Sequence, residues 1–248
     1  MKNPLLLSSL ATVFTVLAAS STHADTIANW TFESSGLGST TPSFAPGAGI
    51  ASTNFYAEGG DDTGTALAFG LHAGAATYTS PAGNGSLKSL SANTWVSGDY
   101  WQFQASLASV VQPISGITLS WDQNGSASGP ATFALEYSTD GTTFTQFGSN
   151  YSLTSGITWS SGTPNQPTQE SFNLSSIVAL DTASTIYFRL VDVSPTTAGA
   201  INGGNVGTAG TDRVDNFTIA TAVVPEPGTL ALAAIGGIAS LMIIRRRK

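Results

Sequence analysis

The sequence of 248 residues contains no cysteine. This absence excludes disulfide bonds, thiolate metal sites and thiol catalysis. A domain of roughly 200 residues does not need disulfides, because a chain of that size buries enough surface to form a hydrophobic core. Packing and hydrogen bonding must therefore stabilise the fold.

Positive charge is also scarce. The chain has eight Lys and Arg against fifteen Asp and Glu, and five of the eight are Lys2 and residues 245–248. Between residues 25 and 224, Lys88, Arg189 and Arg213 stand against fourteen acidic residues, which gives a net charge of −11. Such a segment stays soluble and repels phosphate backbones, which argues against nucleic acid as a partner.

A helical apolar period is missing from residues 25–222, and the good helix formers Lys, Glu and Leu are few. Short apolar or alternating runs recur instead between Gly, Ser, Asn, Asp and Pro. This pattern predicts one all-β domain, an antiparallel two-sheet β-sandwich. The expected strands are 26–33, 52–56, 66–69, 75–80, 100–105, 116–122, 132–138, 143–148, 168–172, 185–192 and 213–221. Asp140-Gly141 predicts a hairpin turn, because Gly supplies the positive φ that such turns need.

Groups for catalysis near neutral pH are few. His72 is the only histidine in residues 25–222, and no G-x-S-x-G elbow lies near it, which argues against a Ser-His-acid arrangement. Paired carboxylates, as in glycosidases, are the remaining catalytic alternative. Most acidic residues lie in turns, where Asp caps backbone N–H groups. We therefore expect no enzyme. The carboxylate candidates are Asp61, Asp62, Asp99, Asp122, Glu136, Asp181, Asp192, Asp212 and Asp215.

A calcium ion is the cofactor most compatible with these residues, because one histidine and no cysteine leave oxygen ligands, which hard cations prefer. Asp122 with Asn124 begins like a calcium loop but lacks the later ligands. Asp212 with Asp215 is the second candidate pair. Turn capping is the alternative at both places.

Tryptophans are candidates for stacking on sugars. Trp30 and Trp121 alternate in phase with apolar neighbours, which predicts core positions. Trp95 and Trp159 lie in loop-like segments and could be exposed stacking residues. Buried anchors for the loops are the alternative.

The N-terminal segment has the order of a secretory signal peptide. Lys2 precedes an apolar run at 5–19, and Thr22-His23-Ala24 offers a cleavage site. We expect residues 1–24 to be removed on export, leaving an extracellular domain at 25–222.

The C-terminal segment combines three features in a fixed order. Pro225-Glu226-Pro227 disfavours helix and central strand. An uncharged apolar stretch follows and predicts a transmembrane helix at 229–244. The cationic cluster Arg245, Arg246, Arg247 and Lys248 marks a cytoplasmic end.

This segment, 223–248, resembles the PEP-CTERM sorting signal of exported bacterial proteins. The resemblance implies processing by an exosortase, a membrane-embedded enzyme, in bacteria that make exopolysaccharide. A plain membrane anchor behind a proline-containing linker is the alternative. A second resemblance, to extracellular jelly-roll and galactose-binding-like domains, rests on 97–103, 117–122, 133–141 and 212–219.

Together these features lead us to expect an exported, non-enzymatic protein of the cell envelope or the exopolysaccharide matrix, as in a biofilm. Its expected partners are the secretion translocon, signal peptidase, the exosortase and exopolysaccharide. It would be anchored transiently in the inner membrane and then reach the cell surface. A carbohydrate-binding module is the alternative, and a polysaccharide hydrolase ranks third.

Overall fold

The computed structural model describes residues 24–34, 43–44, 55–110, 114 and 116–222. These residues belong to one compact unit, Ala24–Val223. Apart from Ala24, the expected signal peptide lies outside the described residues, as does the whole sorting segment with its expected transmembrane helix. In the part of the chain that is described, no helix is long and apolar enough to cross a membrane.

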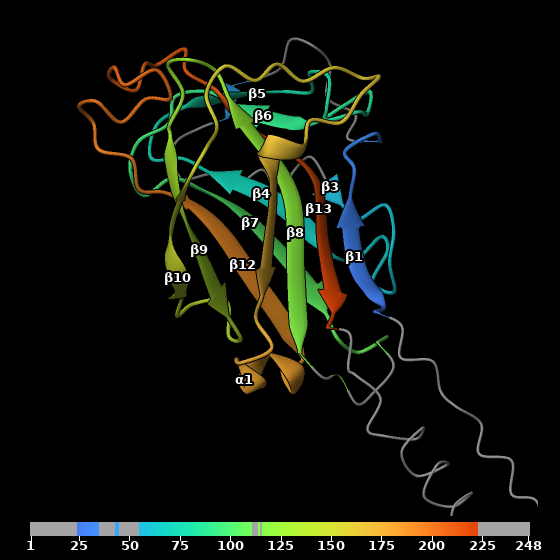
Figure 1. Cartoon of the computed structure of the whole chain (residues 1–248). Coiled ribbons are helices and arrows are strands. Elements are labelled where there is room, and N and C mark those ends of the chain that lie inside the picture. Colours follow the sequence, from blue (N-terminus) through green and yellow to red (C-terminus); the bar gives the residue numbers. More distant parts are fainter. Residues whose placement is uncertain (1–23, 35–42, 45–54, 111–113, 115, 223–248) are drawn as a thin grey trace, which may run out of the picture. The chain divides into compact units, whose positions relative to one another are not determined.

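Seven strands form the first antiparallel sheet (Figure 1). Its hydrogen-bonded order is β11–β8–β13–β6–β5–β2. On the β13 edge away from β8, β6 pairs with residues 212–214 and β1 with residues 217–220. The strands are β1 (Thr26–Trp30), β2 (Ser43–Phe44), β5 (Ala76–Thr79), β6 (Leu90–Ala92), β8 (Ile117–Gly125), β11 (Gln169–Asn173) and β13 (Asp212–Thr221).

Six strands form the second antiparallel sheet, in the order β10–β9–β12–β7–β4–β3. A single 3₁₀ turn, η1 (Gln166–Thr168), and a single α-helical turn, α1 (Val178–Asp181), lie in the connections. The strands are β3 (Phe55–Tyr56), β4 (Leu67–Leu71), β7 (Tyr100–Ser106), β9 (Thr132–Ser138), β10 (Thr145–Ser152) and β12 (Thr185–Asp192).

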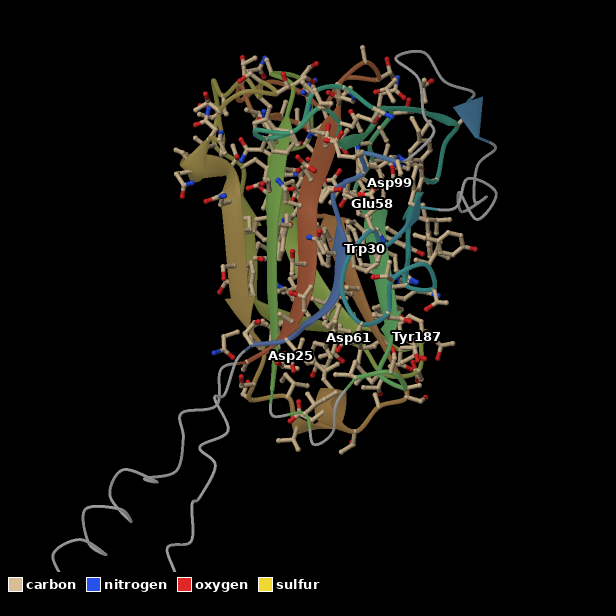
Figure 2. All side chains as sticks on the ribbon, turned by 90° about the vertical axis from the view of Figure 1, so that its right-hand side faces the viewer. Asp25, Trp30, Glu58, Asp61, Asp99 and Tyr187 are labelled. Carbon is tan, nitrogen blue, oxygen red and sulfur yellow. The ribbon has the colours of Figure 1, made fainter. Side chains whose placement is uncertain are left out.

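Aromatic rings from both sheets join the two layers. Phe103 on β7 stacks on Phe217 of β13 with ring centroids 3.5 Å apart. Trp30 on β1 meets Phe103 edge-on at 5.3 Å. All three side chains are fully buried, and Trp30 lies near mid-height of the sandwich, between Asp99 and Asp25 (Figure 2). Because strand side chains alternate between faces, these inward residues leave their neighbours on the outer faces.

The predicted all-β, two-sheet sandwich is confirmed. Every expected strand overlaps an observed one, although residues 52–54 of the strand expected at 52–56 lie outside the described residues. The strands β2 and β6 and the helical turn α1 were not predicted. β6 is three residues long in a segment rich in Ser and Gly, so it is too short to show alternation.

The predicted hairpin joins β9 and β10. Gly141 has a φ of +72°, as the Asp140-Gly141 pair predicts. The side chain of Asp140 accepts hydrogen bonds from the backbone N–H groups of Thr142 and Thr143, both at 2.8 Å. The connection is longer than a two-residue turn, because β9 ends at Ser138 and β10 begins at Thr145.

Replacing Phe217 with alanine should lower the free energy of unfolding by about 3–5 kcal/mol, because it removes the ring that stacks on Phe103 and leaves a cavity between the sheets. Urea unfolding of the full chain measures the change. Leu87→Ala is the control, since Leu87 is 71% exposed and its truncation should cost less than about 0.5 kcal/mol. Equal losses for the two variants would contradict the role of the stack.

Candidate functional site

The two candidate calcium ligands on β13, Asp212 and Asp215, lie on opposite faces of this strand. Asp212 points into the core, where its carboxylate accepts hydrogen bonds from Trp101 Nε1 at 2.6 Å and from Gln123 Nε2 at 3.1 Å. Asp215 is three residues further along the strand and therefore points outward, because successive side chains alternate. The structure does not bring Asp212 and Asp215 together, so they cannot share one cation.

Asp215 instead pairs with Asp122. The two residues are direct cross-strand partners on β13 and β8, so their side chains lie on the same outer face. The Asn216 side chain donates to Asp122 Oδ2 at 2.7 Å and to Asp215 Oδ2 at 3.3 Å. Asn216 has a φ of +50° and lies where the register shifts in a bulge between Asp215 and Thr218. We call Asp122 and Asp215 the outer acid pair.

A loop covers the outer acid pair. Asp215 Oδ2 accepts hydrogen bonds from the Asn84 backbone N–H at 2.9 Å and from the Ser86 hydroxyl at 2.6 Å. A side chain at Gly83 would collide with the Asp215 carboxylate, so this close approach requires glycine. Asp122 and Asp215 are 3% and 0% exposed. The loop therefore closes off Asp215, and Asp122 beside it is almost fully buried.

The Asn84 side chain extends this network to a second loop. Its Oδ1 atom accepts a hydrogen bond from the Asn165 backbone N–H at 2.6 Å, and its Nδ2 atom donates to the Asn165 carbonyl at 3.3 Å. The outer acid pair therefore helps to fix two long loops over one end of the seven-stranded sheet. Sequence reasoning missed the pairing, because contacts between positions 84, 122 and 215 depend on strand register.

Asn124, the expected companion of Asp122, has other partners. It lies on β8 on the same face as Asp122, two residues away. Its Oδ1 atom accepts from the Gly125 backbone N–H at 2.9 Å, and its Nδ2 atom donates to the Ile157 carbonyl at 3.2 Å. Among the described residues, no group of three or more His, Asp or Glu side chains is arranged to hold a metal ion. Calcium binding remains a prediction.

The expectation that Trp95 and Trp159 are exposed stacking residues is wrong. They are 3% and 4% exposed, as the alternative of buried loop anchors predicts. Trp95 Nε1 donates to the Ala92 carbonyl at 2.9 Å, and its ring packs edge-on against Trp101 at 5.2 Å. Trp159 Nε1 donates to the Thr168 hydroxyl at 3.0 Å. Both side chains are buried and satisfy their indole N–H groups inside the protein, so neither ring is open to a sugar.

His72 is buried at the same end as Trp95. Its ring lies 4.4 Å from the Trp95 ring and 5.6 Å from the Tyr78 ring. Its Nδ1 atom is 3.2 Å from Asp99 Oδ2. The Asp99 carboxylate also accepts from the backbone N–H groups of Ala73 and Val96, at 2.7 and 2.9 Å. The only histidine of residues 25–222 therefore belongs to the packed interior rather than to an open cleft.

Burial raises the pKa of several of these carboxyls. It raises the pKa of Asp212 well above its usual range, against the opposing effect of the Trp101 and Gln123 hydrogen bonds. It also raises the pKa of Asp122 and Asp192. For Asp215 it raises the pKa to about 6, although the donors from Ser86, Asn84 and Asn216 work in the opposite direction and Asp122 adds to the rise.

We expect Asp215 to make stability depend on pH between about 4 and 6. Its folded pKa of about 6 lies above the unfolded value of about 3.9. The folded state therefore binds the proton more tightly, so this contribution is complete below the unfolded pKa and is lost as the pH rises through the folded pKa. The loss amounts to about 3 kcal/mol. Urea unfolding at a series of pH values should show that, from pH 4 to pH 7, the free energy of unfolding loses about 3 kcal/mol less in Asp215→Asn than in the unaltered chain.

The control for this experiment is Asp61→Asn, which changes an exposed carboxyl. It should keep the pH dependence of the unaltered chain between pH 4 and 7. If Asp215→Asn had the same pH dependence as Asp61→Asn, the protonation of Asp215 in the folded state would be refuted.

Comparison with models of protein families identifies one motif, at the C-terminal end of the chain. Residues 223–248 match the PEP-CTERM protein-sorting motif. This motif marks exported proteins that are sorted at a membrane. The match agrees with the resemblance of the C-terminal segment and leaves residues 25–222 outside it. No curated protein sequence matches the chain.

Solved structures give weak likenesses. The TmCBM61 structure in complex with β-1,4-galactotriose is 8% identical, with 63% of this chain and 88% of that chain covered and a TM-score of 0.34. The K1 cleaved adhesin domain of Lys-gingipain from Porphyromonas gingivalis W83 is 14% identical, with 59% and 83% covered and a TM-score of 0.35. The CBM22-1 xylan-binding domain of Paenibacillus barcinonensis Xyn10C is 14% identical, with 60% and 82% covered and a TM-score of 0.31. Scores this low carry no argument about the ligand or activity of this chain.

Proposed function

Because residues 223–248 match the PEP-CTERM protein-sorting motif, we propose that the chain is an exported, non-enzymatic component of the cell envelope or the exopolysaccharide matrix, with a structural or adhesive role. The motif is the observation that carries this proposal. The acidic, cysteine-free composition of residues 25–222 supports it, since such a domain stays soluble outside the cell without oxidative folding.

The proposed route begins at the translocon, where signal peptidase removes residues 1–24. The apolar stretch 229–244 then holds the protein in the inner membrane, and the cluster at 245–248 keeps that end cytoplasmic. Pro225-Glu226-Pro227 disfavours regular structure and so presents an extended segment to the exosortase. Processing near this triplet releases the domain to the cell surface or the extracellular space.

Carbohydrate binding is the second candidate function. One observation favours it: Tyr100, Gln104 and Tyr187 share the outer face of the six-stranded sheet. A polysaccharide hydrolase has less support, because Asp122 and Asp215, the two carboxyls paired on the outer face, are covered by a loop. Glycosidases need two carboxyl groups on either side of an open sugar site.

Replacing Pro225-Glu226-Pro227 with Ala-Ala-Ala should abolish processing in the host. The altered segment can continue the helix expected at 229–244, so the extended recognition site is lost. Immunoblots of membrane and extracellular fractions should show a longer product that stays in the membrane.

The matched control is Pro195→Ala, which changes an exposed proline in a loop of the domain. It should leave the size and location of the product unchanged. Normal processing of the Ala-Ala-Ala variant would refute sorting by this motif and leave the C-terminal segment as a simple anchor.

A further inference from the structure

The outward side chains of the six-stranded sheet form three rows across the strands. Register places them side by side, because directly opposite residues of an antiparallel pair share a face. The first row is Leu71, Tyr100, Val191 and Ala134; the second is Phe69, Gln102, Arg189, Glu136 and Gln146; the third is Tyr56, Leu67, Gln104, Tyr187 and Ser138. We call this surface the six-stranded face.

Arg189 lies at the centre of the six-stranded face. Its guanidinium group is stacked between two rings, 4.0 Å from the centroid of Tyr100 and 3.5 Å from that of Phe144. Its Nε atom donates to Gln102 Oε1 at 2.8 Å, and Gln102 Nε2 donates to Gln104 Oε1 at 3.4 Å. These contacts hold the Arg189 guanidinium group and the two amide groups in place among aromatic rings. Binding a ligand would therefore cost these side chains little conformational entropy.

Aromatic side chains also continue to the margins of this face. Tyr56 on β3 is 42% exposed, and Tyr187 on β12 is partly exposed beneath Gly141 of the β9–β10 hairpin. A side chain at Gly141 would lie 3.0 Å from the Tyr187 ring, so the Gly141 backbone packs closely against this ring and holds it in place. Tyr187 lies toward the end of the sandwich marked by Asp25 and Asp61 (Figure 2).

The outer face of the seven-stranded sheet has different chemistry. A hollow of about 340 Å³ there is lined by β8, β11 and β13. The outward residues of that hollow are Ser120, Asp122, Gln169, Ser171, Asn216 and Thr218. Its outward side chains are polar, and none is aromatic. The two outer faces therefore provide an internal comparison, because the outward side chains of this hollow include no ring and no guanidinium group.

Charge narrows the class of ligand. On the six-stranded face, Arg189 lies directly opposite Glu136, so the centre of the face is electrically balanced. The rest of the domain is strongly acidic and repels polyanions. A neutral ligand meets no such penalty.

The side chains of the face match a polyhydroxylated ring. Aromatic faces pack on the apolar C–H side of a sugar, while the Gln104 amide, the Glu136 carboxylate and the Arg189 guanidinium group offer donors and acceptors to hydroxyls. Gln102 is only 5% exposed and holds Arg189 and Gln104 in place. Each of the two longer rows crosses five strands and so spans about 19 Å, since neighbouring strands lie about 4.8 Å apart. That length accommodates several sugar rings.

We propose that the six-stranded face binds a neutral polysaccharide chain laid across the strands, with Tyr187 and Tyr56 as stacking residues and Gln104 as a hydrogen-bonding residue. This inference rests on the proposed function, in which the exported domain contacts matrix polysaccharide. It replaces the two tryptophans of the sequence-based hypothesis, which are buried.

The test is affinity electrophoresis of the purified full chain in detergent, through gels containing xyloglucan, β-1,4-galactan or dextran, with alginate as the acidic polysaccharide. We expect retardation by at least one neutral polysaccharide and none by alginate. Tyr187→Ala and Gln104→Ala should each raise the apparent Kd roughly tenfold, the factor that corresponds to 1.4 kcal/mol. Tyr187→Phe keeps the ring and should bind within about twofold of the unaltered chain.

Gln169→Ala is the matched control on the opposite face and should bind like the unaltered chain. Thermal unfolding of each variant shows whether a loss of binding reflects a loss of fold. The proposal is overturned if none of the neutral polysaccharides retards the chain, if alginate alone does, or if Gln169→Ala weakens binding as much as Gln104→Ala. It is also overturned if Tyr187→Ala converts a dimer into a monomer in sedimentation, because the face would then bind a second copy of the chain.

Failure of this proposal is distinguishable from failure of the proposed function. If the six-stranded face does not bind polysaccharide, the unaltered chain is still processed in its host and the Ala-Ala-Ala variant is not. If the sorting proposal fails, that variant is processed normally whatever the domain binds.

Discussion

The contact between Phe103 and Phe217 is the constraint on which the sandwich depends. Successive side chains of a strand point to opposite faces of the sheet. Because the Phe103 and Phe217 rings both point inward to stack on each other, their contact determines which side chains of β7 and β13 point outward. On β13 this leaves Asp215 on the outer face beneath its loop, after the bulge at Asn216 has shifted the register. On β7 it leaves Tyr100, Gln102 and Gln104 on the six-stranded face.

Much of the fold could be predicted, because strand alternation is local. The runs around Ile117 and Phe133 show their buried face in the sequence itself. β6 could not be predicted in this way, since its three residues form a strand only by pairing with β13. The burial of Trp95 and Trp159 could not be predicted for a related reason. An exposed and a buried tryptophan in a Ser/Thr-rich loop have the same local sequence, and only the folded structure supplies the hydrogen-bond partners of the two buried indoles.

The candidate site also combines features that local sequence predicts with features that depend on the pairing of distant strands. The sequence suggested acidic pairs from residues close together in the chain, but positions three apart on a strand point to opposite faces. In the structure, the register between β13 and β8 places Asp215 directly opposite Asp122. For the six-stranded face, part of the signal was present: Tyr100, Gln102 and Gln104 alternate with Trp101 and Phe103. The sequence alone does not predict the order of the strands, which places Arg189 on β12 beside Gln102 on β7.

The pairing of β1 with β13 has a consequence for export. The first and last strands of the domain are neighbours, closed by a hydrogen bond from the Thr221 backbone N–H to the Asp25 carbonyl at 2.9 Å, and β13 also lies against β8 and β6. A chain that emerges from its N-terminus cannot complete the seven-stranded sheet until residue 221 has crossed. In the proposed export route, the domain therefore closes only after residue 221 has crossed, shortly before the sorting segment reaches the membrane.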